Sequence, residues 1–439
     1  MPGVEVLYNC SIFQGQANPM LIHSASQLLT LTKDPQRGDR LGDLGIIPDG
    51  AVLIDGASIL EAGTSADLLA HFPNEERLDV GGCVLMPGFV DSHTHLVWAG
   101  DRTAEFEMRL QGKSYMEIMA AGGGIQSTVN ATRSASFDDL LSQTRQHARH
   151  IFALGTTCVE AKSGYGLELE TEIKQLDVLL KLDKEGPLEL FPTFLGAHAV
   201  PKEYLDRTDD YVTLICEKML PEIRQWWDAN AQGKPLPFVD VFCERGAFSL
   251  QQSCLILETA KGMGFPLKIH ADEFENLGGA ALAAELGAIS ADHLVKTSVE
   301  DICALAASQT VAVSLPCTPF GLAEKEYTPA KEIIRAGGLL ALASDLNPGT
   351  AWCGNMQFVI ALACRYMQLT PMQAVAAVTI NAAAAVGQAE RLGSIHTGKQ
   401  ADLLVLSVSD YRHLAYQFGS NLVRLIIKKG KVYSQSGLC

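Results

Sequence analysis

The chain has 439 residues, of which 47% are hydrophobic and only 19% are charged, so it is long and apolar enough to bury a substantial core. This length suggests two or three domains, or one large barrel with an appendage. The formal net charge of −16 disfavours binding to nucleic acid or to anionic membranes, because such proteins cluster lysine and arginine on one face.

Short segments with β-branched or alternating apolar residues open the chain, and Gly, Asp and Pro separate them. They predict the strands of a small β domain: Val4–Ile12, Ala51–Ile54 and Ser58–Ala62. After Cys83, strand-like apolar runs alternate with longer helical patterns, which predicts a parallel α/β architecture. The runs are Val84–Asp91, Thr156–Ala161, Leu188–Leu195, Val239–Phe242, Leu267–Ile269, Ile289–Ala291, Thr310–Leu315 and Leu339–Ala343. Eight of them predict a (β/α)₈ TIM-type barrel of about 300 residues.

The end of the chain returns to short strands over Ala401–Leu406 and Leu422–Tyr433. Because the two ends of a chain often lie near each other, these strands can complete the amino-terminal β domain. We therefore expect a composite β-sandwich domain from residues 1–84 and 392–439, and a catalytic barrel over residues 85–391.

Polar residues stand where the predicted barrel strands end, and in such barrels these ends face the active site. His93 and His95 alternate, so both imidazoles lie on one side of an extended segment. A His-x-His alone is weak evidence, because a chain with this many histidines contains one by chance in roughly one case in four. His270 and Asp345, at the ends of other runs, strengthen it. Three imidazoles and a carboxylate suit zinc or iron, which lowers the pKa of a water towards neutrality.

We expect a cytoplasmic protein. The amino terminus lacks the basic start and the continuous apolar stretch of a secretion signal. No stretch approaches the ~18–20 uninterrupted apolar residues that a membrane span needs. The eleven cysteines are scattered and never form Cys-x-x-Cys, which fits a reducing compartment better than a disulfide scaffold.

Several stretches of the sequence carry a resemblance to a known family. They are Pro87–His95, Val159–Gly166, Pro192–His198, His270–Phe274, Ser290–His293 and Ala343–Thr350. The His-x-His with a later His and Asp resembles the metal-dependent amidohydrolase superfamily. The Lys-Ser-Gly-Tyr-Gly and Ser-Asp-Leu-Asn-Pro-Gly-Thr motifs are more specific, and they resemble the family within it that acts in histidine degradation. The likeness covers essentially the whole chain, although Cys158 and Ala161 stand where a threonine and a valine are expected.

This resemblance implies a hydrolase that opens the ring of 4-imidazolone-5-propanoate with water, giving N-formimidoyl-L-glutamate. It implies that His93, His95, His270 and Asp345 hold one Zn²⁺ or Fe³⁺ per chain. The implied substrate contacts are Arg102, Tyr115, Tyr165, His198, Glu273, Asn347, Gly349 and Thr350. Two-metal members of the superfamily carry a carboxylated lysine at the end of strand four, but here Val239–Phe242 leads into Cys-Glu-Arg. We therefore expect a single metal ion.

The reaction requires an activated water, a stabilised oxyanion and a proton for the departing nitrogen. We assign the water to His293, alone or together with Asp345, and the proton to Glu273. Arg102 answers a separate need, because a guanidinium fork can hold the propionate of the substrate with two hydrogen bonds.

Each of these residues also has a plainer interpretation. Arg102 could form a surface ion pair, Tyr115 and Tyr165 could be half-buried rings, and His198 could be a core histidine. Glu273 could be a surface glutamate at the start of a helix. We expect the remaining histidines at the surface: His23, His71, His147, His150, His396 and His413.

Two other functions stay open. Another cyclic-amidine hydrolase, such as a cytosine or guanine deaminase, would share the metal ligands, but its uncharged substrate gives no use for Arg102. A catalytically silent structural relative would have lost metal ligands, and all four are present. The expected partners are a small anionic substrate and a second copy of the chain in a homodimer, with no nucleic acid and no membrane.

Overall fold

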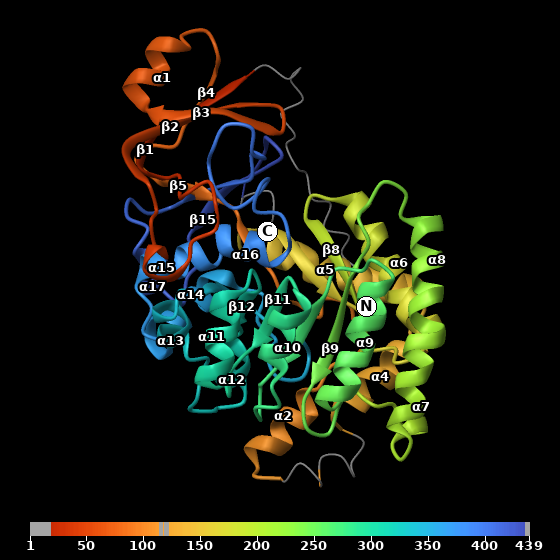
Figure 1. Cartoon of the computed structure of the whole chain (residues 1–439). Coiled ribbons are helices and arrows are strands. Elements are labelled where there is room, and N and C mark those ends of the chain that lie inside the picture. Colours follow the sequence, from red (N-terminus) through yellow and green to blue (C-terminus); the bar gives the residue numbers. More distant parts are fainter. Residues whose placement is uncertain (1–18, 114–116, 118–122, 435–439) are drawn as a thin grey trace.

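The computed structural model describes residues 19–113, 117 and 123–434, so the predicted strand Val4–Ile12 and Tyr115 lie outside the described residues. Two sheets organise this part of the chain. Figure 1 shows the smaller β domain at the top and the helix-covered barrel below it.

The barrel sheet has eight strands, one for each predicted run. They are β6 (Phe89–Asp91), β7 (Thr156–Lys162), β8 (Glu189–Ala197), β9 (Phe238–Cys243), β10 (Lys268–Ala271), β11 (Ser290–His293), β12 (Val311–Ser314) and β13 (Leu339–Leu342). They pair in chain order from β6 to β13, and every pairing is parallel. A parallel bridge between Thr94 and Leu346 links the two outer strands just beyond their ends. The predicted barrel is confirmed.

Helices cover the outside of the barrel (Figure 1). They are α4 (Ile125–Ser134), α5 (Phe137–Ala153), α6 (Leu169–Glu185), α7 (Thr208–Leu214), α8 (Leu220–Asn230), α9 (Leu250–Gly262), α10 (Gly279–Leu286), α11 (Val299–Ala307), α12 (Cys317–Gly321), α13 (Ala330–Arg335), α14 (Met356–Tyr366), α15 (Pro371–Ala377) and α16 (Ile380–Ala385), with 3₁₀ turns η1 (Gly38–Arg40) and η2 (Lys202–Tyr204) and π-helical turn η3 (Ile215–Met219). Helix α2 (Thr103–Leu110) lies at the end of the barrel away from the β domain (Figure 1). Among the helices of the described residues, none is long and apolar enough to cross a bilayer.

The small sheet takes its strands from both ends of the chain, as expected. It contains β1 (Met20–Leu29), β2 (Ile46–Asp55), β3 (Ser58–Thr64), β4 (Glu76–Asp79), β5 (Val84–Pro87), β14 (Leu403–Leu406), β15 (Val423–Lys428) and β16 (Lys431–Ser434), with short helices α1 (Ser65–His71) and α17 (His413–Tyr416) in the same segments. Strand β5 pairs with β1 on one side and with β14 on the other, and so joins the two halves.

The predicted run Val84–Asp91 is divided between the two sheets. Its first half is β5 in the small sheet, and its second half is β6 in the barrel. Gly88 stands at the break, where a Cβ would lie 2.4 Å from Thr157 Oγ1, so only glycine fits. We keep residues 85–391 as the proposed extent of the barrel, with β5 lying across its first boundary.

A buried ion cluster joins the barrel to the small sheet. Lys428 Nζ of β15 lies 2.6 Å from Asp402 Oδ2 and 3.0 Å from Glu189 Oε2 at the start of β8. Cys158, one of the two departures from the family motif, contacts the same ammonium at 3.3 Å. Because buried charges are stable only when paired, this cluster fixes the barrel on the sheet.

The hairpin between β15 and β16 makes one stability prediction. Gly430 has a φ of +76°, and a Cβ there would lie 1.8 Å from Gly56 O. We expect Gly430→Ala to cost about 2–3 kcal/mol of unfolding free energy, because the clash adds to the strained backbone. The control is Gly398→Ala, where φ is +86° but no atom lies within 4 Å of the added Cβ, at a cost of about 1 kcal/mol. Equal losses in thermal unfolding would contradict the steric argument.

Candidate metal centre and substrate pocket

Four buried side chains meet at the carboxyl end of the barrel. His93 and His95 follow β6, His270 lies in β10, and Asp345 follows β13. Asp345 Oδ1 lies 3.5 Å from the Nε2 atoms of both His93 and His95. His270 Nε2 lies 3.4 Å from His95 Nε2. All four predicted metal ligands are therefore neighbours.

Three separations between these atoms fit a metal ion. Ligands that are 2.0–2.2 Å from a tetrahedral zinc lie about 3.3–3.6 Å apart, which matches the distances from Asp345 to His93 and His95 and from His270 to His95. Among the described residues, ligand atoms within 4.8 Å of one another include the groups His93, His95 and Asp345, and His93, His270 and His293. His93 Nε2 and Asp345 Oδ1 are buried and have no hydrogen-bond partner among the described residues, although buried polar atoms normally have one. Burial also lowers the pKa values of His93 and His95 well below the usual value, so both imidazoles are neutral and can donate a lone pair.

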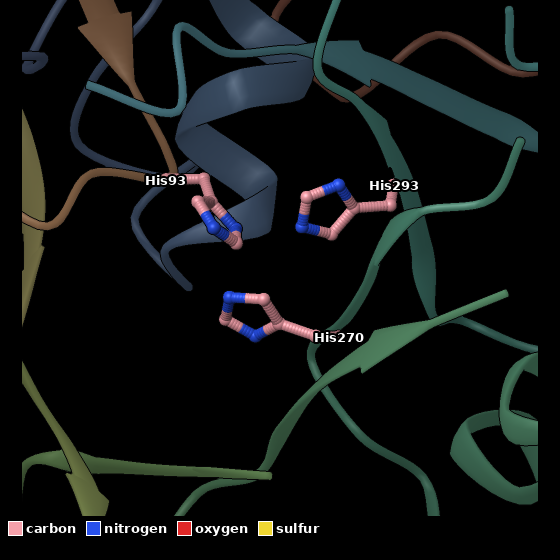
Figure 2. Close-up of side chains that lie close together, drawn as sticks. All are labelled: His93, His270 and His293. Carbon is pink, nitrogen blue, oxygen red and sulfur yellow. The ribbon is translucent and has the colours of Figure 1, made fainter. Parts of the chain in front are cut away.

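His293, at the end of β11, completes a ring of imidazoles around this point. Figure 2 shows His93, His270 and His293 turned towards one another, and the ring centre of His293 lies 5.2 Å from that of His270. The backbone of His293 has a φ of +79°, and that of Asp345 has +54°. Such strained residues cluster at functional sites, where surrounding structure holds them.

Two carboxylates behind the histidines fix the direction of the rings. Asp292 Oδ2 lies 2.6 Å from His93 Nδ1, and Asp240 Oδ2 lies 2.9 Å from His270 Nδ1. Asp292 accepts the ring proton on Nδ1 of His93 and leaves its Nε2 as the free acceptor, which is the usual arrangement behind metal-binding histidines. Asp240 lies close to His270 Nδ1, but the geometry is not that of a hydrogen bond.

Arg102 lies beside this centre and pairs with a glutamate. Its Nε donates to Glu105 Oε2 at 2.8 Å, and its side chain is 15% exposed. The ion-pair interpretation therefore holds, but the pair is largely buried. A Cβ on Gly349 would lie 2.3 Å from Arg102 Nη1, so glycine at 349 leaves room for the guanidinium in its observed position.

The rings of His198 and Tyr165 lie next to that of His95. His198 stacks on His95 with ring centres 4.7 Å apart and an interplanar angle of 16°. Its Nδ1 lies 3.0 Å from Gly164 O, so the proton is on Nδ1 and Nε2 can accept a hydrogen bond. Burial lowers the pKa of His198 to about 3. The ring of Tyr165 lies 5.8 Å from that of His95.

Glu273 faces His293, with Oε2 3.6 Å from His293 Nε2. Burial, together with the charges of Asp345 and Glu244, raises the pKa of Glu273 well above the usual value. The same burial lowers the pKa of His293 well below its usual value. Burial therefore favours the protonated carboxyl of Glu273 and the neutral imidazole of His293.

Asn347, Gly349 and Thr350 form one loop after Asp345. The Asn347 side chain donates to Asp345 O at 2.7 Å and accepts from the backbone N–H groups of Gly349 and Thr350, each at 2.8 Å. Its amide therefore organises the loop, with Gly349 next to Arg102.

Two histidines outside the cluster differ from each other. His150 is exposed, as expected. His147 is half-buried, because its ring stacks on Trp98 with centres 4.0 Å apart and its Nδ1 lies 3.2 Å from Leu96 O. The prediction of a surface position was wrong for His147, whose helical spacing gives no sign of the tryptophan from another segment. His23, His396 and His413 are also half-buried, whereas His71 is exposed as expected.

Comparisons with known proteins place the chain. Residues 84–433 match the model of the amidohydrolase family. The imidazolonepropionase of Herpetosiphon aurantiacus is 49% identical over 95% of this chain and 98% of its own. That of Chloroflexus aggregans is 46% identical over 94% and 98%. The chain belongs to the amidohydrolase family and, within it, to the imidazolonepropionase family.

Solved amidohydrolase structures share the fold. A zinc-bound adenosine deaminase from Xanthomonas campestris superposes with a TM-score of 0.69 and 19% identity, over 96% of this chain and 94% of that one. An atrazine chlorohydrolase variant from Arthrobacter aurescens, complexed with zinc and atraton, gives 0.67 and 15% over 95% and 96%. At such identities the likeness concerns the fold alone.

Sequence reasoning missed the carboxylates behind the ligands. Asp240 and Asp292 each stand within or beside an apolar strand run, and burying a charge is costly unless it is paired. An acidic residue in such a run was the available signal. Glu105 was also missed, although it lies three residues after Arg102 in a helix, at a spacing that brings side chains together.

The ligand cluster predicts zinc-dependent stability. Zinc at about 100 times its dissociation constant should stabilise the chain by about 2.7 kcal/mol, because the metal binds only the folded cluster. His93→Ala should abolish this gain in thermal unfolding experiments. His147→Ala, which alters a half-buried histidine outside the cluster, should keep it. A full gain in the His93 variant would remove His93 from the ligand set.

Proposed function

We propose that this chain hydrolyses 4-imidazolone-5-propanoate to N-formimidoyl-L-glutamate in histidine degradation. The observation that carries the proposal is the similarity to proteins named imidazolonepropionase, at 46–49% identity over nearly the whole of both chains. A hydrolase of a ring C–N bond agrees with the family and with a polar site at the mouth of the barrel.

The proposed cofactor is one Zn²⁺ or Fe³⁺, held by His93, His95, His270 and Asp345. A bound ion of this kind polarises a carbonyl oxygen and lowers the pKa of a water. Two structural neighbours hold zinc, which supports a metal cofactor without choosing between the two ions. For a single ion, the support comes from strand four: β9 ends at Cys243, and Glu244 accepts the backbone N–H of Phe274 at 2.9 Å, with no lysine in place.

The proposed proton transfers follow from burial. His293 is neutral and can take a proton from the water that attacks the ring carbonyl carbon, with Asp345 as the second acceptor. Glu273 is protonated and can give its proton to the ring nitrogen as the C–N bond breaks. The two groups lie 3.6 Å apart, so they serve the same reacting centre.

The remaining residues bind and orient the substrate. Arg102 holds the propionate, and Tyr165 and His198 offer polar atoms beside the ring. The Asn347 loop keeps Gly349 against the guanidinium. Tyr115 stays a predicted contact. The homodimer and the cytoplasmic location also stay predictions, and light scattering on the purified chain tests the first.

Replacing Arg102 tests whether its guanidinium binds the propionate of the substrate. Arg102→Ala should raise KM for 4-imidazolone-5-propanoate by about 10- to 100-fold, since a charge-assisted contact contributes about 1.5–3 kcal/mol. The control is Arg145→Ala, which removes an arginine paired with Glu185 on the helical surface. Unchanged kinetics would take Arg102 out of the site. No formimidoylglutamate from the wild type, with ammonia released from cytosine or guanine, would instead support a deaminase.

Replacing Glu273 tests the proton donor. Glu273→Gln should lower kcat by about 10²- to 10⁴-fold. In the wild type, activity should hold at neutral pH and fall as pH rises through the raised pKa of Glu273, because the carboxyl then loses its proton. That alkaline decline should vanish in the glutamine variant, which cannot titrate. Glu275→Gln, which alters a residue paired with Arg245 at the surface, should leave kcat and the pH profile as they are.

A further inference from the structure

A cluster of buried charges lies inside the barrel behind the proposed metal ligands. It contains the carboxylates Glu160, Asp240 and Asp292 and the ammonium groups of Lys162 and Lys268, and all five are at most 1% exposed. These side chains come from β7, β9, β10 and β11. Three negative charges against two positive ones leave an excess of one negative charge beneath the site of a cation. Buried charges must be paired, so removing either ammonium would leave buried carboxylates without a counter-charge.

Lys162 is the member that touches most of the others. Its Nζ lies 2.7 Å from Glu160 Oε1 and 2.8 Å from Asp240 Oδ2, and 3.9 Å from Asp292 Oδ2. Lys268 contacts only one of the three acids, Asp292, at 3.6 Å, and its other bonds go to Ser290 Oγ and Ser92 O. Lys162 therefore links three strands through their carboxylates, and Lys268 cannot replace it.

Two of these carboxylates lead directly to metal ligands. Asp240 Oδ2 lies 2.9 Å from His270 Nδ1, and its other oxygen accepts the backbone N–H of His270 at 3.2 Å. Asp292 Oδ2 lies 2.6 Å from His93 Nδ1. The position of each ring is thus set by a carboxylate that faces the Lys162 ammonium.

The third carboxylate holds the segment between His93 and His95. Glu160 Oε2 accepts the backbone N–H of Thr94 at 3.2 Å, and Glu160 O accepts Thr94 Oγ1 at 2.7 Å. The backbone N–H of Lys162 donates to Thr94 O at 2.9 Å. All three polar groups of Thr94 are therefore bound by Glu160 and Lys162.

We propose that Lys162 is a positioning residue of the metal centre, which holds Asp240, Asp292 and Glu160 together and thereby aims His270, His93 and His95 at one point. The inference rests on the proposed metal ligands. Without the ammonium, three buried carboxylates repel one another at low dielectric, and the strands that carry them adjust. Carboxylates behind metal ligands typically contribute 10- to 100-fold in metal affinity, so the ammonium that fixes them controls a similar factor.

The test measures zinc affinity by competition with a chromophoric chelator, on Lys162→Met and the wild-type chain. We expect the dissociation constant to rise about 10- to 100-fold in Lys162→Met. The matched control is Lys428→Met, which removes another buried lysine paired with two carboxylates, at the opposite end of the barrel. Both variants should lose thermal stability, but Lys428→Met should bind zinc within about twofold of the wild type.

A second variant keeps the inference testable if Lys162→Met folds poorly. Glu160→Gln combined with Lys162→Met removes one charge of each sign, keeps the balance of the cluster, and should still bind zinc at least about 10-fold more weakly. Wild-type zinc affinity in either folded Lys162 variant would overturn the inference while leaving the metal centre in place. Equal weakening in Lys428→Met would also overturn it, because the effect would then be general destabilisation. A wild-type chain that binds no zinc would reject the metal centre and this inference together.

Discussion

The arrangement at the barrel mouth depends on buried electron-pair donors, two of which have no hydrogen-bond partner among the described residues. His93 Nε2 and Asp345 Oδ1 face each other at 3.5 Å with no proton donor between them, and His95 and His270 bring two further Nε2 atoms to the same place. On the far side of the His93 ring, Asp292 takes the Nδ1 proton, so that ring cannot turn its proton inwards, and Asp240 lies 2.9 Å from Nδ1 of His270. A cation bound here would satisfy the two unpartnered atoms, and this is the observation behind the proposed metal site.

Burial then gives neighbouring groups opposite protonation states. It lowers the pKa of His293 and raises that of Glu273, so an imidazole base and a carboxylic acid stand 3.6 Å apart at one pH. An enzyme that adds water to a carbonyl and releases a nitrogen needs both. The opposite pKa shifts arise because both side chains are buried, and burial disfavours the charged form of each.

The sequence predicts the parts of this site that depend on position along one strand. Eight apolar runs and the polar residues at their ends locate the barrel, the four proposed ligands and His293, because a parallel barrel collects its strand ends at one mouth. It does not predict contacts that depend on register between strands. His270 lies opposite Asp292 in the pairing of β10 with β11, yet Asp292 contacts His93, 199 positions away in the chain. Gly88 likewise stands where one apolar run divides between two sheets, and the side chain of Thr157 leaves no room for a Cβ there. The sequence does not reveal that contact.

The net charge of −16 and an anionic substrate are compatible because they act over different distances. Exposed charges are screened beyond about 8–10 Å at physiological ionic strength. The field inside the pocket is therefore set by the charges that lie in it. Arg102 is partly neutralised by Glu105, so its attraction for a carboxylate is short-ranged and directional rather than a broad positive field. Its Nη1 stays close to Gly349 because that residue has no side chain. Under the proposed function, a small anion is therefore selected by fit at the guanidinium and at the proposed metal, whereas an extended polyanion meets only the acidic exterior.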